Sequence, residues 1–169
     1  MKKYELTDET RVWEGRTLHR IRALIELELD TGDTVKPGDL GGWVENELNL
    51  AQESNAWIAD EAIVCDNARC YQSGLVSDNA IVSGEAQVFG EAWVCDNAQC
   101  YGYSSISGES WIHDNAKVYE NASVSGNVWV RGDSEVCGFA AISGNMKIGG
   151  HRRLKERRDD RGQACMRGV

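Results

Sequence analysis

Histidine is the side chain best suited to acid–base chemistry near neutral pH, and this 169-residue chain has three, His19, His113 and His151. Of these, only His113 lies in the long regular segment of the sequence, directly before Asp114. A carboxylate beside an imidazole is suited to general-base catalysis, so His113 is the candidate catalytic residue. The same pair is equally typical of a solvated turn, and that is the interpretation we favour. Because this segment has a single histidine, which cannot supply the three ligands of a histidine metal site, we predict no metal and no cofactor.

Thiols are the second group of residues with chemical potential. The six cysteines are Cys65, Cys70, Cys95, Cys100, Cys137 and Cys165. Four of them form two pairs with five-residue spacing, in the related stretches VCDNARC and VCDNAQC. This is not the spacing of a zinc site, and a buried cysteine usually acts as a small apolar side chain. We therefore predict structural thiols, with Cys165 exposed in the tail.

Large apolar residues recur at steps of eighteen. The column consists of Trp57, Leu75, Trp93, Trp111 and Trp129, and is followed by Lys147. A contiguous apolar stripe on a protein surface usually marks an interface. We predict that these five residues form such an interface. Shielding of the column by the chain's own first or last residues, binding of another protein, and stacking of a flat ligand or sugar are the alternatives.

The elements that position these residues follow from a six-residue repeat. One β-branched or thiol side chain falls at every sixth position: Ile58, Val64, Cys70, Val76, Val82, Val88, Val94, Cys100, Ile106, Ile112, Val118, Val124, Val130, Val136, Ile142 and Ile148. Two residues before each lies a second column, mostly alanine. A spacing of two is the alternation of a strand, so both columns point inward and the residue between them points out.

Each short strand must be followed by a corner, because the next positions are polar. Asp66, Asp78, Asp96 and Asp114, each followed by Asn, suit such corners because Asp and Asn tolerate left-handed backbone angles. Equal strands with equal corners close as a triangular coil of three hexads, or eighteen residues. We predict an all-β solenoid of roughly five stacked coils, with parallel strands about 4.8 Å apart.

The hexads VCDNAR, VCDNAQ, IHDNAK and VSGEAQ resemble the repeat of left-handed parallel β-helix proteins. The preceding stretch VKPGDLGGWVENELNLAQESNAWI resembles the lead-in of a bacterial and prophage family of hexapeptide-repeat proteins that is loosely labelled as acyltransferases. The resemblance covers roughly residues 18–148 and implies the left-handed sense. It also implies trimers and, in the enzymes, a catalytic histidine in or near an inserted loop. Because residues 56–148 contain no insertion, that expectation is weak here.

The chain divides into three segments. Residues 1–42 are predicted to form a β-hairpin cap, with strands near residues 3–6, 11–13 and 19–29 and turns at Glu14-Gly15 and Pro37-Gly38. Residues 43–148 form the solenoid, in which two extra residues before Ile58 make the first coil irregular. Residues 149–169 form a basic tail, either mobile or a short helix.

Charge limits the class of partner. Residues 43–148 carry fifteen acidic and four basic side chains, a net charge of −11, whereas residues 149–169 carry a net charge of +4. An acidic body repels phosphates, so we predict no direct binding of nucleic acid. The sequence has no apolar stretch of membrane-spanning length and no signal peptide, which indicates a cytoplasmic protein without a membrane partner.

We therefore interpret the chain as a non-enzymatic interaction or scaffold module of a bacterium or phage-infected cell. It is predicted to form homodimers or homotrimers through the tryptophan column, and a host protein is a possible partner. Two alternatives stay open. One is an acyltransferase-like enzyme with a site between subunits near His113. The other is an acidic mimic of nucleic acid that inhibits a host defence protein.

Overall fold

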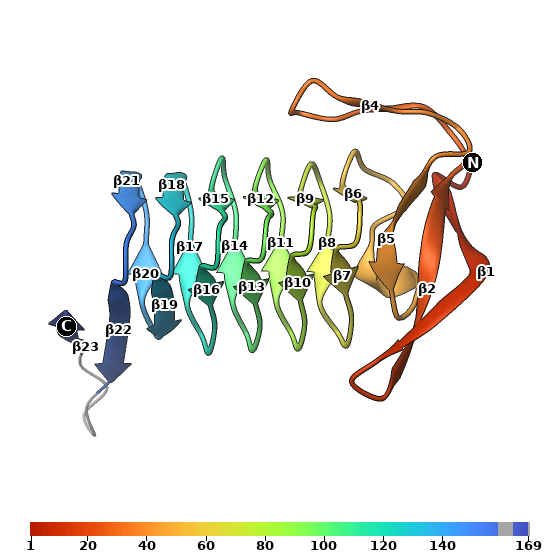
Figure 1. Ribbon diagram of the computed structural model, residues 1–169. Coiled ribbons are helices and arrows are strands. Elements are labelled where there is room, and N and C mark those ends of the chain that lie inside the picture. Colours follow the sequence, from red (N-terminus) through yellow and green to blue (C-terminus); the bar gives the residue numbers. More distant parts are fainter. Residues whose placement is uncertain (159–163, 169) are drawn as a thin grey trace.

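The computed structural model describes residues 1–158 and 164–168, with side chains through Glu156. It is a parallel β-solenoid of stacked coils (Figure 1). Residues that pair between successive coils are eighteen positions apart in the sequence. Trp93 pairs with Trp111, Ile63 with Ile81, and Gln87 with Ser105. The predicted all-β solenoid with three hexads per coil is therefore confirmed. About six turns are formed rather than five, because strands on either side of the regular hexads extend the stack.

Three walls make up the prism. The first, which we call the Trp wall, comprises β6 (Trp57–Ile58), β9 (Leu75–Val76), β12 (Trp93–Val94), β15 (Trp111–Ile112), β18 (Asn127–Val130) and β21 (Asn145–Ile148). The second wall contains β7 (Ile63–Val64), β10 (Ile81–Val82), β13 (Gln99–Cys100), β16 (Lys117–Val118) and β19 (Glu135–Gly138). The third wall contains β8 (Arg69–Cys70), β11 (Gln87–Val88), β14 (Ser105–Ile106), β17 (Ser123–Val124) and β20 (Ala141–Ile142).

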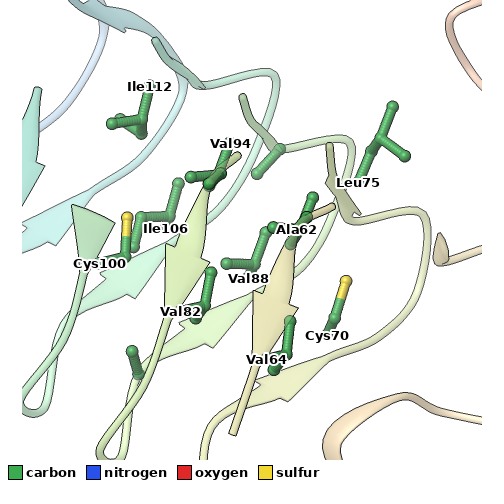
Figure 2. Close-up of a cluster of buried hydrophobic side chains, with 14 of the residues drawn as sticks. Ala62, Val64, Cys70, Leu75, Val82, Val88, Val94, Cys100, Ile106 and Ile112 are labelled. Carbon is green, nitrogen blue, oxygen red and sulfur yellow. The ribbon is translucent and has the colours of Figure 1, made fainter. Parts of the chain in front are cut away.

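The interior is filled by the two inward columns, as the alternation predicted. Val82, Val88, Val94 and Ile106 point into the same narrow core, and all are fully buried (Figure 2). The alanines two residues earlier are fully buried as well, for example Ala80 and Ala86. The exceptions lie in the last coil, where Met146 is 49% exposed and Ile142 is only partly buried. Burial of this uniform column removes apolar surface from water along almost the whole stack, and this stabilises it.

The corners also have the predicted conformation. Asp66, Asp78, Asp96 and Asp114 have φ angles between 55° and 58°, in the left-handed region. Their carboxylates accept backbone N–H groups of the next coil, as in the bond of 2.8 Å from Gly132 N to Asp114 Oδ2. The side chains that suit the turn conformation thus also bind the coil below.

The lead-in extends the second wall by antiparallel strands. β1 (Tyr4–Trp13) pairs with β2 (Arg16–Ala23), and β2 pairs with β5 (Leu40–Val44), which lies parallel to β7. The predicted turn at Glu14-Gly15 is present. The prediction of one strand over residues 19–29 was wrong. β2 ends at Ala23, and β3 (Leu27–Glu28) and β4 (Thr34–Val35) form a separate hairpin.

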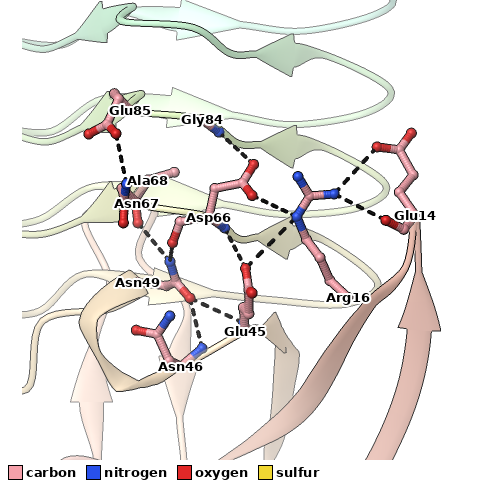
Figure 3. Close-up of polar contacts among 10 residues, drawn as sticks. All are labelled: Glu14, Arg16, Glu45, Asn46, Asn49, Asp66, Asn67, Ala68, Gly84 and Glu85. Carbon is pink, nitrogen blue, oxygen red and sulfur yellow. Dashed lines mark hydrogen bonds and ion pairs between the residues drawn. The ribbon is translucent and has the colours of Figure 1, made fainter.

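The first coil is irregular in the predicted way. Val44 pairs with Val64, and Leu50 forms a bridge with Cys70, so both neighbours are twenty residues apart instead of eighteen. The two extra residues lie between Leu50 and Ile58, since Ile58 already pairs with Val76, eighteen positions later, whereas the short 3₁₀ helix η1 (Glu47–Asn49) lies just before them. The buried amide of Asn49 donates to the carbonyls of Asp66 and Ala68 at 3.0 and 2.9 Å (Figure 3). These bonds anchor η1 to the coil below it.

The expected mobile or helical tail was wrong for the residues that the structure describes. β22 (Arg153–Arg158) pairs in parallel with β19, and β23 (Ala164–Gly168) pairs with β22 in antiparallel orientation. Arg153 pairs with Glu135, at a distance of 3.2 Å between Nε and the carboxylate. The tail is therefore a continuation of the second wall.

Among the described residues, no helix has the length and apolar composition that crossing a membrane requires.

Candidate interaction surface

The tryptophan column is a geometric fact of the Trp wall. Trp57, Leu75, Trp93, Trp111 and Trp129 pair with one another in that order, and Trp129 pairs with Lys147. Each is the outward residue between two inward ones, so its side chain lies on the outer side of the wall. The structure thus brings together all five residues predicted for an interface. The two ends of the column, however, differ in how much of their side chains is exposed.

The N-terminal end of the column, at Trp57 and Leu75, is covered by the protein itself. The hairpin of β3 and β4 with its connecting loop, which we call the arm, extends from the N-terminal end along the stack (Figure 1). Leu27 and Val35 of the arm belong to the same apolar cluster as Trp57. As a result, Trp57 is 2% and Leu75 is 8% exposed. Shielding by the lead-in, one of the alternatives that the sequence left open, thus occurs at this end.

Further along the column, three indoles pack on one another and are partly exposed. The rings of Trp93 and Trp111 stack in parallel at 5.1 Å, whereas Trp129 meets Trp111 edge-on, at 5.0 Å and 71°. Trp93 Nε1 donates to Ser77 Oγ and Trp111 Nε1 donates to Cys95 Sγ, both at 2.9 Å. Because their polar atoms are bonded within the wall, the indoles present mainly apolar surface to the outside.

His113 lies at the corner beside this column. Its side chain is 13% exposed, and its ring packs 4.5 Å from that of Trp111. The Nδ1 atom faces the carboxylates of Asp114 and Asp96, at 3.4 and 3.9 Å, while Nε2 is buried without a hydrogen-bond partner. The backbone N–H of Gly132, together with the nearby imidazole, lowers the pKa of Asp114 below its ordinary value. A catalytic role for His113 remains a prediction.

The described cysteines are buried and free. They are Cys65, Cys70, Cys95, Cys100 and Cys137, whereas the Cys165 side chain lies outside the described residues. Burial raises the pKa values of Cys65, Cys70 and Cys95 to about 12. Since the thiolate is the reactive form, these groups have little nucleophilic character near neutral pH. This agrees with the interpretation of these thiols as structural.

Potential metal ligands do meet at the His113 corner. Asp96, His113 and Asp114 place one donor atom each within 4.8 Å of one another, and Asp78, Cys95 and Asp96 do the same one coil above. The Cys95 sulfur already accepts the indole N–H of Trp111. The sequence missed these groups because the ligands come from successive coils, and the step of eighteen that places them together was applied only to the tryptophans.

A second tryptophan site, not predicted from the sequence, lies in the lead-in. Arg11 and Arg20 place their guanidinium carbons 4.4 and 5.0 Å from the ring centre of Trp43. Glu61 bonds both arginines, at 2.9 and 2.6 Å, and accepts the indole N–H of Trp43 at 3.0 Å. The bond from Arg20 is the main reason that the pKa of Glu61 is lowered. Cation, indole and carboxylate are thus combined in one cluster.

Three hollows adjoin these elements. The largest, about 640 Å³, lies at η1, where the third wall has no strand above β8, and Glu47, Arg69 and Glu85 are among its lining residues. Two others, of about 460 and 470 Å³, lie between the arm and the Trp wall. Both hollows are lined by Leu29, Leu75 and Trp93, which form a shared apolar floor. Asp33 also lines both hollows.

Comparison with known proteins gives a partial similarity. No family model matches the chain. It is 32% identical over 79 residues to the "Uncharacterized acetyltransferase YdcK" of Escherichia coli (strain K12). The match includes 41% of this chain but spans only 24% of that protein's length. Together with the stacked hexads, this similarity fits the hexapeptide-repeat β-helix family that the sequence resembles.

Proposed function

We propose that this protein is a non-enzymatic interaction module that self-associates through the partly exposed end of the tryptophan column. The observation that carries the proposal is the contiguous indole surface of Trp93, Trp111 and Trp129 on one flat wall. Apolar patches of this kind are typical of contacts between proteins, and tryptophan is enriched at the centres of such contacts. The expected assembly is a homodimer or homotrimer, and an accessory phage or prophage role against a host protein is its suggested context.

The regularity of the prism supports a scaffold over an enzyme. From Trp57 to Ile148, all of which the structure describes, each strand is followed by a corner of the same kind and no loop is inserted. A flat wall without a loop offers little concave surface in which a substrate could be held and shielded from water. The Trp wall offers instead a flat, rigid surface, which suits contact with another folded chain.

Solution mass tests the proposal directly. We expect the wild-type protein to sediment as a dimer or trimer and the double variant Trp111→Glu/Trp129→Glu to sediment as a monomer. The matched control is Ser105→Glu/Ser123→Glu, which adds the same two charges at outward positions of the third wall and should retain the wild-type mass. A thermal unfolding curve for each variant verifies that it is folded. A monomeric wild-type protein, or equal dissociation of both double variants, would contradict the proposal.

The acyltransferase alternative is supported by the printed name of the similar Escherichia coli protein. Under that alternative, His113 would be the general base at a site between subunits. Thermal unfolding with and without acetyl-coenzyme A separates the two functions. Stabilisation by the cofactor that is lost in His113→Asn would favour the enzyme, whereas an unchanged unfolding temperature would favour the interaction module.

A further inference from the structure

The two hollows between the arm and the Trp wall, which we call the arm cleft, have an apolar floor and an acidic rim. The floor includes Leu29, Leu75 and Trp93. On one side the rim carries Asp39, Asp60 and Asp78, on the other Asp30, Glu91 and Glu109, and Asp33 reaches both. None of the residues that line either hollow is Lys, Arg or His. The cleft therefore combines apolar surface with uncompensated negative charge.

The rim carboxylates lack cationic partners within the described part of the chain. Several accept hydrogen bonds: Asp39 from the backbone N–H of Lys36, at 2.8 Å, and Asp78 from the Ser77 hydroxyl, at 2.9 Å. None of the seven takes part in an ion pair between described residues, whereas Glu5, Glu45 and Glu61, which lie outside the cleft, all pair with arginines of the lead-in. Arg11, Arg16, Arg20 and Arg22 of the lead-in are thus paired with other carboxylates.

At two other tryptophans of this protein, a basic side chain lies over the indole ring. At Trp43, two guanidinium groups lie over the indole and are held by the carboxylate of Glu61. At the C-terminal end of the column, Lys147 Nζ lies 4.1 Å from the ring centre of Trp129. A cation over an indole is stabilised by the negative charge on the face of the ring. The arm cleft has the indole and the carboxylates but no cation.

We propose that the arm cleft binds a basic segment of a partner protein, with arginine or lysine side chains paired to the carboxylates of the rim and apolar side chains on the floor of Leu29, Leu75 and Trp93. The charge of the cleft selects this occupant, since an acidic rim repels both nucleic acid and acidic peptides. Arginine fits best, because its planar guanidinium stacks on an indole and pairs with a carboxylate at once. The inference rests on the proposed role as an interaction module but not on self-association.

The test uses a fluorescent peptide in which arginine alternates with leucine, and a second peptide with uncharged citrulline at each arginine. Binding is followed by fluorescence anisotropy of the full-length protein at low and at physiological salt. We expect the arginine peptide to bind, to bind more weakly as salt rises, and the citrulline peptide not to bind. Failure of the arginine peptide to bind, or equal binding of both peptides, would overturn the inference.

Variants then place the peptide on the protein. Asp33→Asn/Asp78→Asn should weaken binding about tenfold or more, because it removes two negative charges from the rim that would pair with the arginines of the peptide. The control Glu53→Gln/Glu85→Gln removes the same charge from residues that do not line the cleft, and its affinity should stay within about twofold of the wild type. Equal losses in both variants would indicate general attraction to an acidic surface and would overturn the inference.

The self-association variant separates this inference from the proposed function. Trp111 and Trp129 line neither hollow, and their replacement adds negative charge beside the cleft, so Trp111→Glu/Trp129→Glu should bind the arginine peptide at least as tightly as the wild type. If the wild-type protein is a monomer but binds the peptide in the cleft, self-association is wrong and the arm cleft stands. If the protein assembles as proposed but does not bind the peptide, only the inference on the cleft is wrong.

Discussion

Trp57 and Trp111 occupy equivalent places in the repeat, three coils apart on the same wall, yet their surroundings differ. Trp57 is covered by the arm and almost fully buried. Trp111 is packed between Trp93 and Trp129 and remains partly exposed. The repeat thus creates a column of equal side chains, and a segment outside the repeat makes them unequal. One end of the column is buried within the chain, and the other end is partly exposed.

The largest expected effect compares these two tryptophans directly. Trp57→Ala should reduce the free energy of unfolding by about 3–5 kcal/mol, because it leaves a cavity beneath the arm. Trp111→Ala should cost about 1–2 kcal/mol, since the ring is partly exposed and less contact is lost. Urea unfolding of both variants measures the difference. Equal losses would mean that the arm does not cover Trp57 in solution.

The interior should not show this difference between the two ends. Ala62 lies at the N-terminal end of the stack, where its carbonyl accepts the backbone N–H of Trp43, and Ala86 lies farther along, and both are fully buried. Substitution of either by leucine should overpack the narrow core and reduce stability by about 1–3 kcal/mol. The same urea experiment verifies this. A large difference between Ala62→Leu and Ala86→Leu would show that the coils differ inside as well as outside.

Alkaline pH should weaken the interior through its thiols. Burial raises the pKa of Cys100 above its ordinary value of 9.0, so folding favours the protonated thiol. That contribution is complete below pH 9 and is lost as pH rises above it, because the unfolded chain then releases the proton first. From pH 7 to pH 10 the wild type should lose about 1 kcal/mol more stability than Cys100→Val. Parallel pH profiles of the two proteins would contradict this.

The smallest effect is expected on the third wall, whose outer surface has no aromatic column. Ser105 is the outward residue of β14 and lies between Gln87 and Ser123 of the neighbouring coils. Ser105→Glu should change the free energy of unfolding by no more than about 0.5 kcal/mol. Thermal and urea unfolding can detect a larger change. A loss comparable to that of Trp111→Ala would show that outward positions matter equally on all walls.

Most of the prism could be predicted from sequence because each element depends on a local pattern that recurs. The inward columns follow from alternation, the corners from residues such as Asp66 and Asp114, and the vertical neighbours from counting eighteen residues. Even the irregular first coil followed from two surplus residues before Ile58. The left-handed sense was implied only by the family resemblance, since a period carries no handedness.

The arm, the Trp43 cluster and the strand at Arg153 could not be predicted in this way. Leu27 and Val35 join the apolar cluster that contains Trp57, and Arg11 and Arg20 lie over Trp43, across sequence separations that no period relates. β22 continues the inward column by one more hexad, because Leu154 pairs with Val136, but Arg152 stands two residues earlier where the repeat has a small side chain. The sequence alone therefore determined where residues of the repeat lie relative to one another. Only the tertiary structure decided which of them are covered, because burial depends on where non-repeated segments fold back.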